Sequence, residues 1–379
     1  MQIKSVVLRN FRNYSFEKFI FNPKVNVLVG DNAQGKTNLL EGIYFSCIGK
    51  SFKTKNEREL IKKENTYSTI NLDFEKQNGD NKIFIEFKNG EKYVKLNEIN
   101  ITKISSLLGN LCCVFFSPNE LKLVKDAPED RRKFMDIDIS QLSKEYYLSL
   151  LKYNKILKER NKLLKSTDST EIILETLPIW DYQLVKVASE IILDRLDFIK
   201  KLNLLSGKEH EFLTENAETL KLQYSSVEDF YEKTKDEIEE ILLKKLKENY
   251  EKDLKLKYTT VGPHRDDIKI FLNDFDVKNF GSQGQQRTVL LSMKLAELEI
   301  FKDNFGEYPI LLLDDVFSEL DEKRKHNLFK RTQKVQTFIT TTKFDIVEDD
   351  VNVITIENGK ILIKKWLFSI KNARNKPKK

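Results

Sequence analysis

The chain has 379 residues, more than one ordinary hydrophobic core accommodates, so about two domains are expected. Hydrophobic residues make up 40% and charged residues 33% of the sequence, a balance typical of a globular protein with very polar surfaces. No apolar run is long enough to span a bilayer, and we expect a cytoplasmic protein with no membrane partner. The net charge of +6 comes mostly from the last nine residues, which carry five basic side chains, so any basic nucleic-acid surface must be a local patch.

Three cysteines are present, at Cys47, Cys112 and Cys113, and their spacing matches no metal-binding pattern. The adjacent pair lies in an apolar, strand-like run. We expect buried, reduced thiols.

The first 118 residues are predicted to be a region of strands. Residues 3–8 and 25–29 are apolar strand segments, and residues 83–87 and 93–96 alternate apolar and polar side chains. Asn89-Gly90 lies between the last two, a pair that favours a tight hairpin turn because both turn residues need positive φ.

Residues 119–254 are expected to form a separate helical lobe. Leucine and isoleucine recur there at helical spacing, and Gly207 is the only glycine between Gly109 and Gly262. Pro178 and the polar stretch at 166–170 are expected to interrupt the helices.

Strands return after residue 255. Residues 310–313 and 337–340 are predicted to be short buried strands, and residues 353–356 and 361–363 a closing hairpin. We therefore predict one discontinuous domain at 1–118 and 255–370, with a basic, solvated tail at 371–379.

A phosphate-binding loop is predicted directly after the strand at 25–29. Its residues fit the pattern G-x-x-x-x-G-K-[ST] and are Gly30, Asp31, Asn32, Ala33, Gln34, Gly35, Lys36 and Thr37. Glycines let backbone N–H groups face phosphate oxygens, and the following helix adds its positive end. Lys36 would contact the β- and γ-phosphates of ATP, and the Thr37 hydroxyl would bind Mg²⁺. The alternative, a chance glycine-rich turn, fits poorly with the strand before it and the helix after it.

The apolar run at 310–313 ends in Asp314 and Asp315. Apolar residues on both faces are typical of a central parallel strand. Asp314 would bind the Mg²⁺ ion, and Asp315 would orient the attacking water or accept its proton, so Asp315 and Lys36 are the candidate catalytic residues. Two helix-capping acids are the alternative interpretation.

A polar turn opens the helix that follows residue 282. It consists of Ser282, Gln283, Gly284, Gln285 and Gln286. Ser282 suits the helix N-cap, and Gly284 would let a ligand approach the backbone closely. Alone, the pattern also fits an ordinary capped helix.

The three motifs together resemble the head of an ABC-type ATPase of the SMC-like group, and more narrowly the RecF family of bacterial recombination mediators. The narrower resemblance rests on residues 10–14 (N-F-R-N-Y), 116–118 (F-S-P), 128–136 (P-E-D-R-R-K-F-M-D), 159–161 (E-R-N), 180–184 (W-D-Y-Q-L) and 262–267 (G-P-H-R-D-D). It covers nearly the whole chain except the basic tail. It implies an α/β fold: an ABC-type ATPase head with mixed and parallel β-sheets, plus a helical insertion lobe.

The resemblance also implies an ATP-switched homodimer. ATP on one subunit would be completed in trans by Ser282, Gln283, Gly284 and Gln285 of the other, and Ser318 and Asp321 would belong to a D-loop at the interface. Slow, DNA-dependent ATP hydrolysis would reset the switch. The implied role is binding of single-stranded or gapped DNA in recombinational repair and replication restart, recombinase loading and SOS induction, with the mediator proteins RecR and RecO as partners.

Two further residues are ambiguous in sequence. By analogy with related heads Arg12 would reach the nucleotide phosphates, and the alternative is a surface salt bridge. His264 is not expected to bind a metal, because no second His or Cys is near it in sequence. It is interpreted as part of a structural turn, and the alternative is a role near DNA or the nucleotide. Two expected residues are missing: Thr340 to Thr342 stand where a histidine often follows, and Ser117 to Asn119 where a glutamine is expected.

Two basic clusters are candidates for DNA contact through phosphate groups, which are bound without sequence preference. They contain Arg131 and Arg132, and Lys155, Lys158, Arg160 and Lys162. Solvated helix faces are the competing interpretation. Alternative functions are the ATPase subunit of a DNA-processing nuclease or of an ABC transporter.

Overall fold

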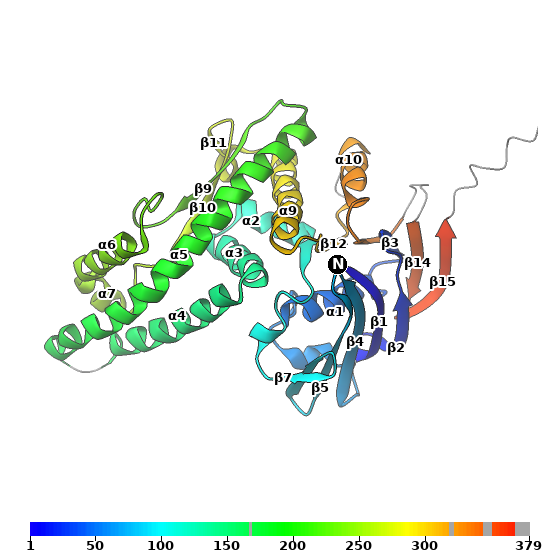
Figure 1. Ribbon diagram of the computed structural model, residues 1–379, viewed down its shortest axis with the longest axis horizontal. Helices are drawn as coiled ribbons and strands as arrows, with labels where there is room; N and C mark the ends of the chain where they lie inside the picture. Colours follow the sequence, from blue (N-terminus) through cyan, green and yellow to red (C-terminus); the bar gives the residue numbers. More distant parts are fainter. Residues whose placement is uncertain (167–168, 318–321, 344–350, 368–379) are drawn as a thin grey trace, which may run out of the picture. The chain divides into compact units, whose positions relative to one another are not determined.

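The computed structural model describes residues 1–166, 169–317, 322–343 and 351–367 (Figure 1). The chain divides into two compact units, the first formed by residues 1–120 and 297–379 and the second by residues 121–296. The first predicted boundary, after residue 118, lies close to the observed one. The second shifts from residue 254 to residue 296, because the strand at 267–272 pairs with a strand of the second unit. The polar turn at 282–285 therefore belongs to the second unit.

The first unit contains an antiparallel sheet of six strands in the order β2-β1-β4-β5-β6-β7. Their bounds are β1 Gln2–Phe11, β2 Tyr14–Ile20, β4 Tyr67–Lys76, β5 Gly79–Lys88, β6 Glu91–Leu96 and β7 Ile99–Ile101. The predicted hairpin is confirmed: Asn89 and Gly90 have φ of +55° and +81°, the left-handed values that a tight turn requires.

The second sheet of the first unit has the order β15-β14-β3-β13-β12-β8. Its strands are β3 Val25–Val29, β8 Cys113–Phe116, β12 Ile310–Asp314, β13 Thr337–Thr341, β14 Val351–Glu357 and β15 Lys360–Leu367. All neighbours pair in parallel except the edge hairpin of β14 and β15. Parallel strands end at the same edge, so the segments after β3, β12 and β13 converge there.

Helix α1 (Lys36–Ile48) packs against β8, β12 and β13 of the parallel sheet and against β4 of the antiparallel sheet. Its residues are buried around nearly the whole circumference, as expected for a helix enclosed on both sides. Phe45 meets Phe87 edge to face, with ring centroids 5.1 Å apart. Cys47 lies on this helix and is buried without a disulfide, as are Cys112 and Cys113, which confirms the expected free thiols. The remaining segments of the unit are η1 Glu57–Leu60, η2 Ile104–Ser106, η3 Pro118–Leu121 and α10 Glu322–Thr332.

The second unit is mainly helical but also carries a three-stranded sheet in the order β11-β10-β9. Its elements are α2 Lys122–Lys125, α3 Pro128–Leu142, α4 Lys144–Leu163, α5 Thr170–Thr214, β9 Leu220–Ser225, α6 Lys235–Glu248, α7 Tyr250–Leu256, β10 Asp267–Leu272, β11 Phe275–Asp276 and α8 Val277–Phe280. Helix α9 (Gln283–Phe305) begins in this unit and continues into the first. The long α5 and α4 pack along each other and form the body of the unit.

The expected break at Pro178 is wrong, because α5 runs through it without interruption. Proline removes the hydrogen bond to the carbonyl four residues earlier, here that of Leu174. Pro178 and Leu174 are both exposed, so water can satisfy that carbonyl and the helix continues. The expected break near residues 166–170 is confirmed, since α4 ends at Leu163 and Ser169 caps the start of α5.

Candidate functional site

The loop after β3 is fixed by two neighbouring turns. Asn13 Nδ2 and Gly359 N both donate to Gln34 O, at 2.9 Å each. Tyr14 Oη donates to Gly35 O at 2.9 Å. Gly35 has φ of +121°, and a Cβ there would lie 2.8 Å from Asn13 Nδ2. Only glycine fits this position, so the loop is held in one curled conformation.

Lys36 begins α1 and folds its side chain back over the loop. Its Nζ donates to Gly30 O at 2.6 Å and to Asp31 O at 2.7 Å, and the residue is 7% exposed. Burial lowers the pKa of Lys36, and the carboxylates of Asp315, Asp314 and Asp31 oppose this shift. An anion entering the loop would meet this ammonium and the positive end of α1 together.

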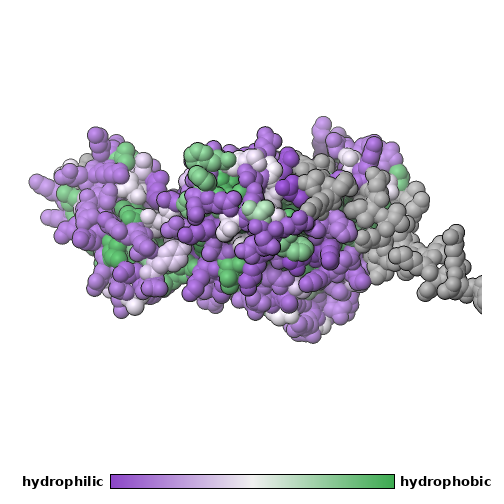
Figure 2. All heavy atoms as spheres, turned by 90° about the horizontal axis from the view of Figure 1, so that it is seen from above, coloured by the Kyte–Doolittle hydropathy of each residue, from purple (hydrophilic) through white to green (hydrophobic). Residues whose placement is uncertain are grey.

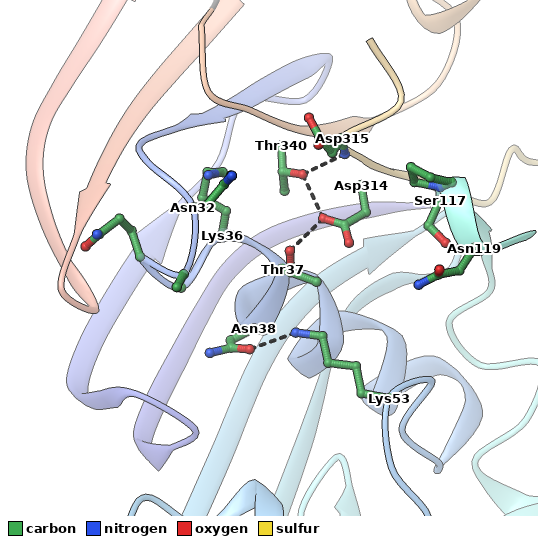
Figure 3. A pocket seen from close by; sticks show the side chains of 14 residues that line it. Asn32, Lys36, Thr37, Asn38, Lys53, Ser117, Asn119, Asp314, Asp315 and Thr340 are labelled. Atoms are coloured by element: carbon green, nitrogen blue, oxygen red, sulfur yellow. Dashed lines mark hydrogen bonds between the residues drawn. The ribbon is translucent and has the colours of Figure 1, made fainter. Parts of the chain in front are cut away.

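Asp314 at the end of β12 links the loop to the neighbouring strand (Figure 3). Its Oδ1 accepts from Thr37 Oγ1 at 2.8 Å and from Thr340 Oγ1 at 2.7 Å. Thr340 Oγ1 accepts in turn from Asp315 N at 2.9 Å. No described residue donates to Asp314 Oδ2. One carboxylate oxygen is therefore used to fix the side chain, and the other is available to a ligand.

Asp315 leaves the strand in a left-handed conformation, with φ of +54°, which aspartate tolerates better than most residues. Its side chain lines the same cavity as Thr37 and Asp314. This cavity has a volume of about 330 Å³ and is lined by residues 32–38, by Asp314, Asp315 and Thr340, and by Lys53 and residues 117–119. The structure thus brings together the predicted loop and both aspartates in a space of ligand size.

Lys53 is a lining residue that the sequence alone did not identify. Its Nζ donates to Asn38 Oδ1 at 2.9 Å (Figure 3). The same atom lies 3.9 Å from Glu41 Oε2. Partial burial lowers the pKa of Lys53, opposed by the carboxylates of Glu41 and Asp314. The adjacent Phe52 ring stacks on Phe115 at a centroid distance of 4.2 Å, which positions this segment. No local pattern reveals Lys53, because its place depends on a contact with a strand far along the chain.

Arg12 is held by a buried acid rather than by the loop. Its Nε and Nη2 donate to the two oxygens of Glu41, at 2.8 and 2.6 Å, and Nη1 donates to Glu59 O at 2.9 Å. The Glu41 side chain is fully buried, so the pair is not the surface salt bridge of the alternative interpretation. Arg12 lines a second cavity, of about 610 Å³, which shares Asn38 and Lys53 with the first. A contact with the nucleotide remains a prediction.

In the second unit, the turn at 282–285 forms a reciprocal helix cap. Ser282 Oγ accepts from Gln285 N at 3.3 Å, and Gln285 Oε1 accepts from Ser282 N at 2.8 Å. This is the capping-box arrangement of Ser followed three residues later by Gln. Ser282 and Gln283 are exposed at the start of the turn, whereas Gly284 and Gln285 are partly buried. The predicted N-cap is therefore confirmed.

The prediction that Arg160 and Arg131 contact DNA is wrong. Arg160 is fully buried, with Nε 2.6 Å from Asp181 Oδ1 and Nη1 2.8 Å from Asp253 Oδ2. Arg131 is 5% exposed and pairs with Asp267 at 2.6 Å. Their charges are neutralised inside the unit, because a buried guanidinium needs carboxylate partners, and they present nothing to a phosphate backbone.

The other DNA candidates stay available to solvent. Lys155, Lys158 and Lys162 lie on α4 at least partly exposed, and no described carboxylate lies within ion-pairing distance of them. Arg132 is partly exposed and donates to Asp266 O at 2.9 Å. The predicted D-loop residues Ser318 and Asp321 and the basic tail at 371–379 lie outside the described residues.

His264 is part of a structural turn. Its Nδ1 lies 2.6 Å from Tyr153 Oη and its Nε2 lies 3.0 Å from Thr259 O, while Arg265 N closes the turn on Gly262 O at 2.8 Å. Burial lowers the pKa of His264 to about 4. The predicted structural role is confirmed.

Comparisons with known proteins agree over nearly the whole chain. Residues 2–362 match the family described as the RecF/RecN/SMC N terminal domain. The DNA replication and repair protein RecF of Alkaliphilus oremlandii is 46% identical over 367 residues, covering 95% of this chain and 100% of that protein. A solved structure of the recombination mediator protein RecF with ATP, in the RecFOR pathway, has a TM-score of 0.89 at 36% identity, covering 96% of this chain and 97% of that one.

The Smc head domain of Pyrococcus furiosus, solved with an extended coiled coil, has a TM-score of 0.56 at 15% identity, covering 97% of this chain and 96% of that one. At that identity the likeness concerns the fold, and it agrees with the expected ATPase-head architecture. Within the described part of the chain, no helix combines the length and apolar character needed to cross a membrane.

Proposed function

This chain belongs to the RecF family of DNA replication and repair proteins, and from that membership we propose that it is an ATP-switched DNA-binding protein of recombinational repair. The observation that carries the proposal is the bond between Thr37 Oγ1 and Asp314 Oδ1, at 2.8 Å, inside one cavity. It joins a phosphate-binding loop to an acidic strand, the pairing that nucleotide hydrolysis requires.

ATP fits the loop by the chemistry of its donors. Lys36 Nζ is satisfied by two loop carbonyls, and it would exchange these for phosphate oxygens, which are stronger partners for an ammonium. Residues 30–37 would surround the phosphates with backbone N–H groups. Lys53 adds a second cation to the lining of the same cavity.

Mg²⁺ fits Thr37 and Asp314, because a hydroxyl and a carboxylate oxygen without a described donor are hard oxygen ligands. Bound there, the ion would neutralise charge that develops on the phosphates. Asp315 is the candidate for orienting the attacking water or accepting its proton. Its side chain is shorter than glutamate, which suits slow hydrolysis and a switch rather than a motor.

The turn at 282–285 is proposed to complete the ATP site of a second subunit. Ser282 and Gln283 are available to a partner at its exposed start. Two exposed aromatic rings precede them: Phe275 and Phe280 are 64% and 72% exposed, with centroids 6.1 Å apart. The face in Figure 2 is mostly hydrophilic, and hydrophobic side chains form separate patches on it. An exposed aromatic pair two residues from the turn favours coverage by a second copy of the chain.

The proposed DNA surface is the exposed face of α4. Lys155, Lys158 and Lys162 are spaced at i, i+3 and i+7, and Lys165 continues the row just beyond the helix. Contacts from such a lysine row would bind the phosphate backbone of single-stranded or gapped DNA without sequence preference. The family relationship also supports mediator proteins as partners, with RecR and RecO assisting recombinase loading and SOS induction.

The decisive experiment is light scattering with ATP and Mg²⁺, with and without gapped DNA. The wild-type chain should dimerise only with ATP, whereas Lys36→Arg and Asp314→Ala should stay monomeric under all conditions. Equal association of the wild type and both variants, with and without ATP, would overturn the proposed switch.

A further inference from the structure

Gln285 is engaged on both ends of its side-chain amide. Its Oε1 accepts from Ser282 N at 2.8 Å, and its Nε2 donates to Glu218 Oε1 at 2.8 Å. Both bonds stay within the second unit, one to the start of α9 and one to the segment between α5 and β9. Gln285 therefore fixes the shape of the turn, and Ser282 and Gln283 are the side chains that it leaves available.

Glu218 is itself held in place by His210 of α5. Glu218 Oε2 lies 3.2 Å from His210 Nε2, and the His210 side chain is fully buried. His210 Nδ1 lies 3.0 Å from Ser292 Oγ, and Ser292 Oγ donates to Thr288 O at 2.8 Å. The buried imidazole therefore bridges Glu218 and Ser292 through its two ring nitrogens.

We propose that Glu218 is a positioning residue for the ATP site that the 282–285 turn completes on a second subunit. Glu218 contacts the fully buried His210 of α5 and accepts a hydrogen bond from the Gln285 amide that closes the helix cap. It therefore fixes the exposed turn to the helical body. The inference rests on the proposed shared ATP site. It also changes the predicted role of Gln285. Instead of contacting the partner's nucleotide, Gln285 would hold Ser282 and Gln283 in position.

Three variants separate this role from a loss of folding. Glu218→Ala removes the acceptor of the Gln285 amide, and the ATP hydrolysis rate should fall about tenfold, as expected for a displaced contact group. Glu218→Gln keeps an oxygen for that amide and should retain most of the rate. Glu211→Ala removes a neighbouring exposed acid and should behave as the wild type. ATP affinity should be unchanged in all three, because the loop at 30–37 is untouched.

Mixed dimers test whether Glu218 acts across the interface. Asp315→Asn chains should bind ATP and dimerise without hydrolysing it. In a mixture of Glu218→Ala and Asp315→Asn chains, a mixed dimer contains one ATP site with an intact loop, an intact Asp315 and an intact Glu218 turn. The mixture should therefore hydrolyse ATP faster than either variant alone. A mixture of Ser282→Arg with Asp315→Asn is the reference for the shared site and should show the same gain.

The outcomes are distinct. If the Ser282→Arg mixture gains activity and the Glu218→Ala mixture does not, the positioning role is overturned while the shared site stands. If neither mixture gains activity, the shared site fails, and the inference with it. Should Glu218→Ala not fold, Gln285→Glu offers a second test, because it places a carboxylate against Glu218. This variant should lose ATP hydrolysis in the same way and regain it in the mixture. A wild-type rate in Gln285→Glu would also overturn the positioning role.

Discussion

Asp314 and Thr340 are directly paired across β12 and β13, and the Thr340 hydroxyl lies 2.7 Å from Asp314 Oδ1. Together with Thr37 it fixes the rotation of the carboxylate, so that Oδ1 is occupied by the protein. Thr340 stands in the segment where a histidine was expected from the family resemblance. Its observed contacts give this threonine a different role, because it positions the acidic residue that we propose binds Mg²⁺.

Thr340→Val should raise the Mg²⁺ concentration needed for half-maximal ATP hydrolysis by about tenfold, because outer partners of metal ligands contribute affinity on that scale. Valine keeps the shape of threonine and removes only the hydroxyl. Thr340→Ser restores the hydroxyl and should restore the wild-type requirement. A Mg²⁺ titration of the ATPase rate measures both, and an unchanged midpoint for Thr340→Val would contradict this role.

Arg160→Met should destabilise the second unit by about 3–5 kcal/mol, because it leaves two buried carboxylates without their cation. Those carboxylates belong to Asp181 and Asp253, which are 1% and 0% exposed. Urea unfolding measures the loss. An unfolding free energy within about 1 kcal/mol of the wild type would show that water or protonation compensates the pair.

Lys158→Ala should leave stability unchanged and weaken DNA binding instead. One lost phosphate contact reduces the slope of log affinity against log salt by about one. Binding of gapped DNA at several salt concentrations gives this slope. Lys244, an exposed lysine of α6 paired only weakly with Glu248 at 4.0 Å, offers a matched control as Lys244→Ala. Equal slopes for both variants and the wild type would contradict the proposal that the exposed face of α4 binds DNA.

Local patterns predicted those parts of the molecule whose structure depends on neighbours in sequence. The loop at 30–37 and the strand ending at Asp314 could be identified because a glycine- and lysine-containing turn and an apolar strand are set by residues adjacent in sequence. The burial of Arg160 could not be predicted from its helix, because its carboxylate partners come from two other helices. The continuity of α5 through Pro178 depends on the solvent exposure of Leu174 and Pro178, which no residue pattern reports.

The same limit explains the shifted domain boundary. Composition changes after residue 255, where glycines and strand-like runs return, and this change indicated a return to the first domain. Strand β10 instead pairs with β9, so the chain stays in the second unit until α9. Strand pairing between distant segments leaves no local trace, and β9 itself lies in a stretch whose composition predicted helix.

Stability should depend on pH through His264. Burial lowers its pKa to about 4 in the fold, from 6.5 in an unfolded chain. Below pH 6.5 the unfolded chain binds a proton at His264 before the folded chain does. The stability that the neutral, buried His264 contributes is therefore complete at neutral pH and is lost as pH falls to about 4. The full difference is about 3 kcal/mol. His264→Gln keeps polar contacts but cannot titrate, so the stability difference between the wild type and this variant should shrink over that interval; a constant difference would contradict the buried neutral histidine.

Asp315→Asn should separate nucleotide binding from hydrolysis. Asparagine has the same size as aspartate and tolerates the left-handed conformation with φ of +54°, so the backbone after β12 should be unchanged. Asp314, Thr37 and the loop would still bind ATP and Mg²⁺, but no carboxylate would orient or deprotonate the attacking water, and the hydrolysis rate should fall at least about 100-fold. The ATP-induced dimer should then persist, with the light-scattering signal decaying more slowly by the same factor. A variant that hydrolyses ATP normally would exclude Asp315 as the base, and one that no longer dimerises would assign Asp315 to nucleotide binding.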